Sequence, residues 1–555
     1  MAIAPDMDAP DDDRTRPTTE GLVVSIGLGL IAAVLALLVS RDRISVAQDS
    51  AIYLGIAHNL LHGHGLTSPL TLLFTDSFTP LATRTFHGSL PVTTLPPGYS
   101  LLVAAVGVFG VSLETAARIV GALSLGVATF LLARMSLRLT GGAWPVAIGV
   151  AVLFLGAGPL SEAGIVPGSW LLLSAFALSE VPFLAVALAT LLALAALLRT
   201  GSRSFLVLTG LGIGAAILLR FLGIALLGTA VLLVAFDRSH PLRERLRQVV
   251  VLGVLGLGPT LVWLASMALV VGRGKASTPP RYHSLATMRL RSGLENVAHW
   301  LVPTNVADGL AIVILVVVIV AVAGMAVLLM RHDPPDFLAP VPPDEPLRDP
   351  LLRVLGVFAV ISILALVGSH LVVNAAISFD VRFIAPLRAI AYVLLAVIVY
   401  RFLRRAHVGV AAVIVLGACI VVTLPFAGDA VRLVRDGAIS GLSRPSPTIE
   451  AVRDLPEDAV IVTNVPEQVW LRADRSSIIV PVKFVPEADL RNDRYRADLA
   501  ETKRLLEQPN TYLVMLGGLY QTGGLLATTE DLRQVVPLKP VAAYPDGAIY
   551  RAAPS

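Results

Sequence analysis

Residues 21–40 read G-L-V-V-S-I-G-L-G-L-I-A-A-V-L-A-L-L-V-S, and residues 41–65 continue R-D-R-I-S-V-A-Q-D-S-A-I-Y-L-G-I-A-H-N-L-L-H-G-H-G. The first stretch carries no charge and has about the twenty residues that a helix needs to cross a hydrocarbon core. The second places Asp49 nine residues beyond the apolar stretch, at the membrane surface. A carboxylate beside a bilayer is costly unless it has water, a partner or a function. The sequence therefore predicts a membrane span that is followed by an acid with a role.

The composition extends this pattern to the whole chain. Of its 555 residues, 55% are hydrophobic and only 15% are charged, whereas soluble domains have roughly 25% charged residues. We therefore expect a mostly α-helical, polytopic membrane protein. The formal net charge of +4 does not indicate nucleic-acid binding, because the arginines lie in short loops between apolar segments, where they report topology. The single cysteine, Cys419, excludes an intrachain disulfide.

Eleven segments have the length and apolar character of membrane spans. One long apolar stretch is divided at Arg220, because an arginine is costly at mid-membrane but not at a helix end. The first span is too long for a signal-peptide core, so it is interpreted as a retained anchor behind a disordered cytoplasmic N-terminus, residues 1–20. The expected spans are residues 21–40, 115–133, 143–160, 180–198, 204–219, 221–236, 249–271, 309–330, 354–373, 383–400 and 408–427.

The charges of the loops test this count. If the N-terminus is cytoplasmic, all five cytoplasmic loops are rich in arginine, as the positive-inside rule requires. The odd number of spans then places residues 428–555 outside the cell, on the same side as a long first outer loop, residues 41–114. We expect a multi-pass protein of the plasma membrane. The arginines are Arg134, Arg138, Arg199, Arg203, Arg238, Arg243, Arg245, Arg247, Arg331, Arg348, Arg353, Arg401, Arg404 and Arg405.

The tail from residue 428 onward changes character. The segments A-V-I-V-T-N, S-I-I-V-P-V and T-Y-L-V-M-L are typical of short buried strands, and residues 497–508 of a helix between them. Asp546-Gly547 lies between two further strand-like runs and predicts a hairpin. We therefore expect a small extracytoplasmic α/β domain. The proline-rich and acidic residues 333–350 predict a flexible cytoplasmic linker.

Asp49 begins a segment in which Tyr53, Ala57, Leu60 and Leu61 recur at helical spacing. This spacing predicts an amphipathic helix that lies on the membrane and that Gly63 and Gly65 end. The helix macrodipole would favour the ionised carboxylate near the N-terminus. Such a carboxylate can accept a proton from an incoming hydroxyl, which is general-base catalysis. The alternative is an N-cap without a catalytic role.

Further motifs lie at the expected outer ends of the spans. L-P-P-G-Y at residues 95–99 precedes an apolar run that is too short to span and that we expect to form a second interfacial helix. S-E-V-P-F at residues 179–183 places Glu180 at the outer end of a span, and F-D-V-R-F-I-A-P at residues 379–386 does the same for Asp380 and Arg382. The run G-L-G-I-G-A-A-I-L-L-R, ending at Arg220, is interpreted as small residues for close helix packing rather than as a nucleotide loop.

In order and sidedness these motifs resemble the GT-C glycosyltransferases. More closely they resemble the bacterial family 39-like branch, which is related to protein mannosyltransferases and lipid A aminoarabinose transferases. The resemblance covers residues 21–427 and implies that a sugar is transferred from a polyprenyl-phosphate-linked donor to a glycan, lipid or protein acceptor at the outer face of the membrane. It assigns the base, or the acceptor-positioning group, to Asp49. The substrate-binding candidates are Tyr53, Pro97, Tyr99, Arg220, Asp380 and Arg382.

The chain departs from this family at two positions. Many relatives carry a paired Asp-Glu where this chain has Asp49-Ser50, which leaves a second acid to be assigned. Glu180 is the preferred catalytic candidate for it and Asp76 a poorer one. Many relatives also carry a polar residue in front of the Pro-Pro pair, where this chain has Leu95.

Arginine suits the phosphate of such a donor, because the guanidinium fork matches phosphate geometry and a cation stabilises the charge that develops on the leaving group. Arg220 and Arg382 are the best placed. Basic residues between 272 and 308 either add to this grip or bind lipid headgroups: Arg273, Lys275, Arg281, Arg289 and Arg291.

The first outer loop also contains histidines at a spacing that metal sites use. His58 and His62 are four residues apart on the expected helix, but a third ligand is not defined. The sequence therefore predicts no metal site and no cofactor, and the histidines are interpreted as polar residues at the membrane surface.

Two other functions remain open. A transporter or flippase of a lipid-linked substrate usually has repeated halves and ionisable groups near the bilayer midplane, whereas here the charges lie at the ends of spans. A non-catalytic receptor or scaffold would use the tail to bind a partner. For the tail of an enzyme, we expect acceptor presentation, a lid over the membrane site or a structural cap.

Overall fold

The computed structural model describes residues 19–70, 90–92, 95–156, 169–271, 282–284, 290–332, 349–373, 379, 381–437, 445–485, 490–517 and 524–553. Nearly all of the expected disordered N-terminus, residues 1–20, lies outside these ranges, and so does nearly all of the expected linker, residues 333–350.

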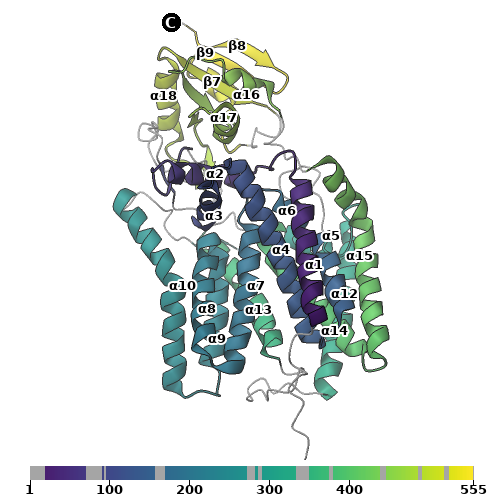
Figure 1. The fold of residues 1–555 in the computed structure, drawn as a ribbon. Coiled ribbons are helices and arrows are strands. Elements are labelled where there is room, and N and C mark those ends of the chain that lie inside the picture. Colours follow the sequence, from purple (N-terminus) through teal and green to yellow (C-terminus); the bar gives the residue numbers. More distant parts are fainter. Residues whose placement is uncertain are drawn as a thin grey trace, which may run out of the picture.

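Every expected span coincides with a helix, and together the helices form a bundle (Figure 1). Eight of the described helices are long and apolar enough to cross a bilayer, while α5, α8 and α9 are shorter. The chain is therefore a multi-pass membrane protein. The helices are α1 (Thr19–Val39), α4 (Leu113–Thr140), α5 (Trp144–Gly156), α7 (Glu180–Thr200), α8 (Arg203–Leu219), α9 (Ile224–Ala235), α10 (Leu242–Val271), α12 (Asp308–His332), α13 (Pro350–Val372), α14 (Val381–Leu403) and α15 (Val408–Asp436).

The ends of two helices bear on the interpretation of the sequence. α8 ends at Leu219, Arg220 has an extended backbone, and the one-turn 3₁₀ helix η3 (Phe221–Gly223) leads into α9, so the break expected at Arg220 is confirmed. α15 was expected to end at residue 427 but continues to Asp436. Its last turns include Arg432 and Arg435, and an amphipathic end of this kind can extend a helix beyond the apolar stretch that a hydropathy pattern detects.

Glycines allow the helices to approach one another closely. A Cβ atom on Gly29 of α1 would lie 2.9 Å from the carbonyl oxygen of Gly126 in α4, and the reverse distance is the same. In the run G-L-G-I-G, a Cβ on Gly214 would lie 2.7 Å from the carbonyl oxygen of Leu255 in α10, and one on Gly212 would clash with the hydroxyl of Thr190 in α7. The interpretation of this run as a packing surface is therefore confirmed.

One end of the bundle is covered by two short helices, α2 (Gln48–Leu61) and α3 (Gly98–Gly107) (Figure 1). Both were expected from the sequence, and Gly63 and Gly65 follow α2 with positive φ values of 78° and 71°. α2 is more enclosed than a helix lying on a bilayer would be, because residues 50–57 are all buried. Its neighbours include α3, α4 and the two-stranded ladder of β1 (Thr67–Ser68) and β2 (Leu90–Pro91). The short helices α6 (Trp170–Ser174) and α11 (Leu290–Ala298) complete this part of the chain.

A small α/β domain lies above α2 (Figure 1). Its sheet has the order β4-β3-β7-β9-β8. The strands β4, β3 and β7 are parallel to one another, and β9 is antiparallel to both of its neighbours, β7 and β8. The hairpin expected at Asp546-Gly547 joins β8 and β9, with Pro545 and Asp546 in its turn and Gly547 paired with Tyr544 at the start of β9. The elements are α16 (Pro447–Val452), β3 (Val460–Thr463), α17 (Pro466–Ala473), β4 (Ile478–Ile479), β5 (Phe484–Val485), β6 (Leu490–Arg491), α18 (Tyr495–Leu506), β7 (Thr511–Leu516), α19 (Thr529–Arg533), β8 (Leu538–Tyr544) and β9 (Gly547–Ala552).

Successive side chains of the central strands fill two separate cores, one on each face of the sheet. In β7, Leu513 and Met515 belong to one core and Tyr512 and Val514 to the other. This alternation follows from the two-residue period of a strand, and it explains why the strand sequences contain continuous apolar runs. The central strand β7 is buried on both faces, so the tail has hydrophobic cores of its own.

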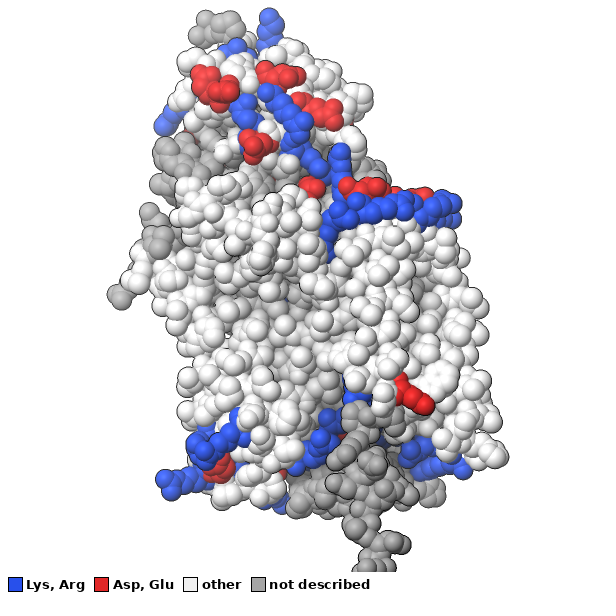
Figure 2. All heavy atoms as spheres, viewed as in Figure 1, with Lys and Arg blue, Asp and Glu red and all other residues white. Residues whose placement is uncertain are grey.

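Charged side chains gather toward the two ends of the molecule, and a broad band between them is almost free of charge in the view of Figure 2. The band corresponds to the bundle of Figure 1. At the end away from the small domain, Arg138 donates to Asp349 over 2.8 Å and joins α4 to the start of α13. This distribution is the one that a bilayer imposes, because charges are costly inside the hydrocarbon region.

Gly98 provides a test of this packing. A Cβ there would lie 2.5 Å from the carbonyl oxygen of Leu218, so α3 would have to move away from the end of α8. We expect Gly98→Ala to lower the free energy of unfolding by about 1–3 kcal/mol, the usual cost of overpacking, measured as a fall in melting temperature in detergent. Gly27→Ala is the control, since no atom lies within 4 Å of its added Cβ. Equal melting temperatures for both variants would contradict this account of α3.

Candidate active site

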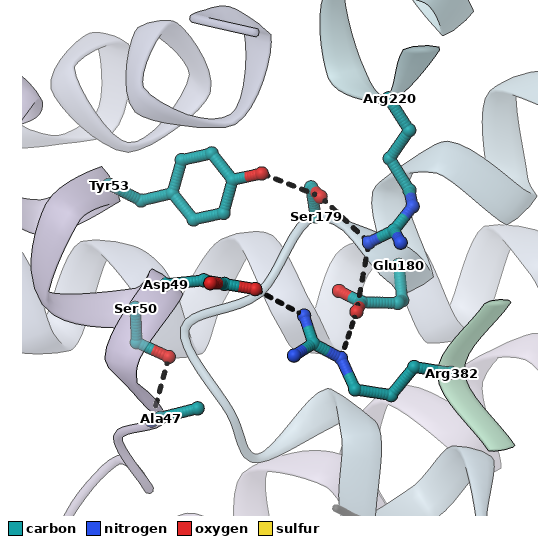
Figure 3. Close-up of polar contacts among 8 residues, drawn as sticks. All are labelled: Ala47, Asp49, Ser50, Tyr53, Ser179, Glu180, Arg220 and Arg382. Carbon is teal, nitrogen blue, oxygen red and sulfur yellow. Dashed lines mark hydrogen bonds and ion pairs between the residues drawn. The ribbon is translucent and has the colours of Figure 1, made fainter. Parts of the chain in front are cut away.

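Four segments bring charged side chains together beneath the small domain. Asp49 lies in the first turn of α2, Glu180 is the first residue of α7, Arg220 follows α8, and Arg382 lies at the start of α14 (Figure 3). The two carboxylates stand at helix N-termini, where unpaired backbone amides favour a negative charge. Arg220 lies at the break between α8 and α9, where its backbone is extended rather than helical. The four residues were all predicted from the sequence as site residues.

Arg382 joins the two acids. Its Nε donates to Oε1 of Glu180 over 2.6 Å, and its Nη2 donates to Oδ2 of Asp49 over 2.7 Å (Figure 3). These distances are those of charge-assisted hydrogen bonds. One guanidinium therefore links α14 to α2 and to α7.

Arg220 approaches the same carboxylate from the opposite side. Its Nη1 lies 2.9 Å from Oε1 of Glu180 and donates to the hydroxyl of Ser179 over 3.4 Å. Its guanidinium carbon also lies 5.6 Å from the ring centroid of Phe383, a cation–π distance. With two carboxylates and two guanidinium groups, the charges of the cluster balance.

The two acids differ in their access to the surroundings. The side chain of Glu180 is 1% exposed, and its second oxygen, Oε2, has no hydrogen-bond partner within the described part of the chain. The side chain of Asp49 is 32% exposed. A substrate can therefore reach Asp49, whereas Glu180 is enclosed by the protein.

Ser50 replaces the second acid that the family resemblance leads one to expect beside Asp49. It is buried, and its hydroxyl accepts a hydrogen bond from the backbone amide of Ala47 over 3.0 Å. This bond is at the start of α2, and the N-cap position itself is Ala47. The alternative interpretation, in which Asp49 is the N-cap of this helix, is therefore wrong. In space, the second carboxylate near Asp49 is Glu180, which is held by the same arginine.

The predicted residues Tyr53 and Tyr99 form the wall behind the charges. Their rings meet edge to face with centroids 5.1 Å apart. The hydroxyls of Tyr53 and Ser179 are 3.1 Å apart, and the hydroxyl of Ser100 donates to the carbonyl oxygen of Tyr53 over 2.9 Å. Burial raises the pKa of Tyr53 to about 12 and also raises that of Tyr99. Both phenols therefore stay protonated at neutral pH, and neither is a base there.

Pro97 lies next to this wall rather than among the charges. It is the N-cap residue of α3, the helix that carries Tyr99. Proline suits a helix start, because its fixed φ is compatible with the first turn and its missing amide costs nothing there. Its part in the site is therefore to start the helix on which Tyr99 is presented.

Sequence reasoning missed the two serines of the wall. Ser179 precedes Glu180 within the quoted motif S-E-V-P-F, and this position was a signal that could have been used. Ser100 offers no such signal, because only the folded chain brings it to the backbone of Tyr53.

Several other candidates are not brought together here. Arg291 is exposed and pairs with Glu295 on its own helix, α11, over 2.8 Å. Asp76, Arg273, Lys275, Arg281, Arg289 and Asp380 lie outside the described residues.

The two histidines that stand four residues apart at the end of α2 pack against each other. His58 and His62 stack with ring centroids 4.1 Å apart. Among the residues that the structure describes, no group of three or more histidine, cysteine or acidic side chains is arranged to hold a metal ion.

No protein-family model and no curated protein sequence matches this chain. Solved structures do. ArnT from Cupriavidus metallidurans bound to undecaprenyl phosphate superposes over its whole length on 97% of this chain, with 14% identity and a TM-score of 0.55. The apo state of the same protein gives 13% identity and a TM-score of 0.57 over the same shares. The arabinofuranosyltransferase AftD from Mycobacteria superposes 42% of its length on 97% of this chain, with 16% identity and a TM-score of 0.52.

These superpositions include the helical bundle and the small domain alike, since 97% of the chain is covered each time. The fold implied by the motifs of the sequence is thereby confirmed, and this chain has the fold of the GT-C glycosyltransferases.

Proposed function

We propose that this protein is a membrane glycosyltransferase that moves a sugar from a polyprenyl-phosphate-linked donor to a hydroxyl-bearing acceptor. The observation that carries the proposal is the cluster of Asp49, Glu180, Arg220 and Arg382 at one end of a GT-C bundle (Figure 3). It combines an accessible carboxylate with two guanidinium groups, which is what transfer from a sugar phosphate requires. The likeness in fold to ArnT bound to undecaprenyl phosphate supports a lipid-linked donor.

Asp49 is the base in this reaction. Its carboxylate accepts the proton of the acceptor hydroxyl while the acceptor oxygen forms a bond to the anomeric carbon of the sugar. The bond from that carbon to the phosphate oxygen breaks, and the electron pair stays on polyprenyl phosphate. Arg220 and Arg382 stabilise this growing negative charge, since preorganised cations at a developing oxyanion lower the barrier.

Proton transfer and phosphate binding are coupled through Arg382. In the structure described here, its Nη2 donates to Asp49. When Asp49 takes up the proton, it loses its charge and its hold on that guanidinium, at the moment when charge develops on the phosphate. Arg382 can then turn its electrostatic interaction toward the leaving group without a net charge being buried.

Glu180 positions the two arginines. It is 1% exposed, and a single oxygen, Oε1, accepts a hydrogen bond from Arg382 and forms an ion pair with Arg220. A carboxylate that a substrate cannot reach cannot accept the substrate's proton. Glu180 therefore takes no part in proton transfer and instead holds Arg220 and Arg382 in place.

The reaction takes place at the outer face of the plasma membrane. The site lies at the end of the bundle that carries the small domain, whereas the pair of Arg138 and Asp349 lies at the other end. Arg138 belongs to the arginine-rich loops that the positive-inside rule assigns to the cytoplasm. The small domain and the N-terminus are then on opposite sides of the membrane, and the acceptor is a glycan, lipid or protein of the cell envelope.

The role of Asp49 is tested by Asp49→Asn. The amide cannot accept the proton, so we expect the transfer rate from a panel of labelled polyprenyl-phosphate sugars to fall at least about a hundredfold. Asp42→Asn is the matched control, because Asp42 is 63% exposed and pairs with its neighbour Arg41, and it should retain full activity. Undiminished transfer by Asp49→Asn would refute the assignment of the base. Movement of the lipid across the bilayer without any sugar transfer would favour a transporter instead.

Glu180→Gln separates positioning from base catalysis. It leaves two enclosed guanidinium groups with one carboxylate fewer, and breaking a buried ion pair costs about 3–5 kcal/mol. We expect its melting temperature in detergent to fall clearly, while that of Asp49→Asn changes little because Asp49 is partly exposed. A stable but inactive Glu180→Gln protein would argue that Glu180 itself exchanges protons.

Arg382→Lys tests the bridge. An ammonium group lacks the fork that reaches Glu180 and Asp49 at once, so we expect the KM for the donor to rise roughly tenfold and kcat to fall as well. Arg435→Lys serves as the control, since Arg435 is 72% exposed and pairs with Asp436. If Arg382→Lys kept the wild-type kcat and KM, the arginine would have no special part in phosphate binding.

A further inference from the structure

The small domain contacts the helix that carries Asp49. Its helix α17 lies on α2 (Figure 1), and the ring of Trp470 in α17 meets the ring of His58 in α2 edge to face, with centroids 5.9 Å apart and an interplanar angle of 82°. The ring of His58 also stacks on that of His62, with centroids 4.1 Å apart. The last turn of α2 is thus engaged by an aromatic side chain from a different domain.

The contact is part of a larger anchorage of α17 on the bundle. Trp470 and Leu471 are partly buried and pack against the hydrophobic core of the membrane domain. The next residue is Arg472, whose Nη1 lies 3.7 Å from Oε1 of Glu114 at the start of α4. α17 therefore binds to the bundle through apolar packing as well as charge, and it does not reach α2 as a loosely attached lid.

The first turns of α2 are held differently. There Asp49 accepts from Arg382, and the hydroxyl of Tyr53 lies 3.1 Å from that of Ser179. In the proposed reaction, Asp49 loses its charge in every turnover, so its ion pair with Arg382 cannot hold the helix throughout. Contacts that do not change charge must hold the helix instead: the hydroxyl pair of Tyr53 and Ser179 acts near its start, and the contact with Trp470 acts at its last turn.

A helix transmits such an anchor to its other end. His58 is nine residues from Asp49, about 13 Å along a helix that rises about 1.5 Å per residue. The intervening side chains, among them Tyr53, Leu54 and Ile56, are buried, so the helix packs as one rigid unit and a displacement of its last turn is carried to Asp49.

We propose that the small domain is a positioning element of the transfer site, in which Trp470 clamps α2 through His58 and thereby fixes Asp49 opposite the acceptor. This proposal rests on the proposed function in taking Asp49 as the base. It assigns Trp470 and His58 to positioning, because neither lies among the charges of the site. It also gives the tail a role other than acceptor presentation, a lid or a passive cap.

The full-length protein in detergent provides the test, through hydrogen exchange of the α2 amides, a readout that does not depend on activity. We expect Trp470→Ala to lower the protection of these amides about tenfold or more, since the opening of a segment reflects the loss of the contacts that hold it. Trp470→Phe keeps an aromatic edge for His58 and should restore most of the protection. The control is Val541→Ala in β8, a residue that is 53% exposed.

A second variant guards against a general loss of folding. If Trp470→Ala also lowered protection in β3 and β7, the domain itself would have been damaged, and His58→Ala then decides. This change leaves the small domain intact, and alanine has a high helix propensity. His62→Ala removes the ring that stacks on His58 and should keep the protection, so a loss seen in His58→Ala alone comes from the contact with Trp470. Wild-type protection of α2 in both His58→Ala and Trp470→Ala would overturn the proposal.

Kinetics separate this proposal from the proposed function. With transfer established, Trp470→Ala should lower kcat about tenfold and leave the KM for the donor nearly unchanged, because Arg220 and Arg382 stay in place while Asp49 is displaced. A rise of about tenfold in the KM for the donor, with kcat unchanged, would contradict a role in positioning the base. If the wild type transferred no sugar, the proposed function would fail, while the exchange experiment would still decide whether Trp470 clamps α2.

Discussion

The contact of Arg382 with Glu180 and Asp49 is the interaction on which the arrangement of this end of the molecule depends. Charges in a medium of low dielectric constant are tolerated only when they are paired and hydrogen-bonded. Arg382 satisfies this requirement for α14, α2 and α7 at once, and Arg220 completes it from the end of α8. The helices that bear these groups can therefore meet in only a few ways. The same pairing that stabilises the fold prepares cations and a carboxylate for chemistry.

Close packing places these charges where they can meet. Glycines let α8 approach α7 and α10, and the helix then stops at Arg220 instead of continuing through the bilayer. Gly98 allows α3 to lie directly on the end of α8, next to that arginine. The position of one guanidinium thus depends on several contacts that carry no charge, as is usual where interiors are packed as densely as crystals.

Charge balance connects the structure to the proposed reaction. Before the substrate binds, two carboxylates compensate two guanidinium groups. Polyprenyl phosphate brings a negative charge and the acceptor brings a proton, so protonation of Asp49 lets the cluster remain near neutrality as the phosphate leaves. Such a site needs a helix that stays in place while its own ion pair changes. The small domain, packed on α2 through Trp470, meets this need from a part of the chain far away in sequence.

The sequence by itself determined the elements: the apolar lengths predicted the helices of the bundle, the arginine predicted the break after Leu219, and Asp49 and the two glycines predicted the bounds of α2. These features are local, because hydrophobic length, helix termini and backbone freedom act within a few residues. Only the tertiary structure decided that Asp49 and Arg382, 333 residues apart, share a hydrogen bond, that Glu180 is closed to solvent, and that Trp470 reaches His58. Pairing and burial depend on how the helices and the small domain pack together, and residue order does not encode that packing in a form that a local pattern can reveal.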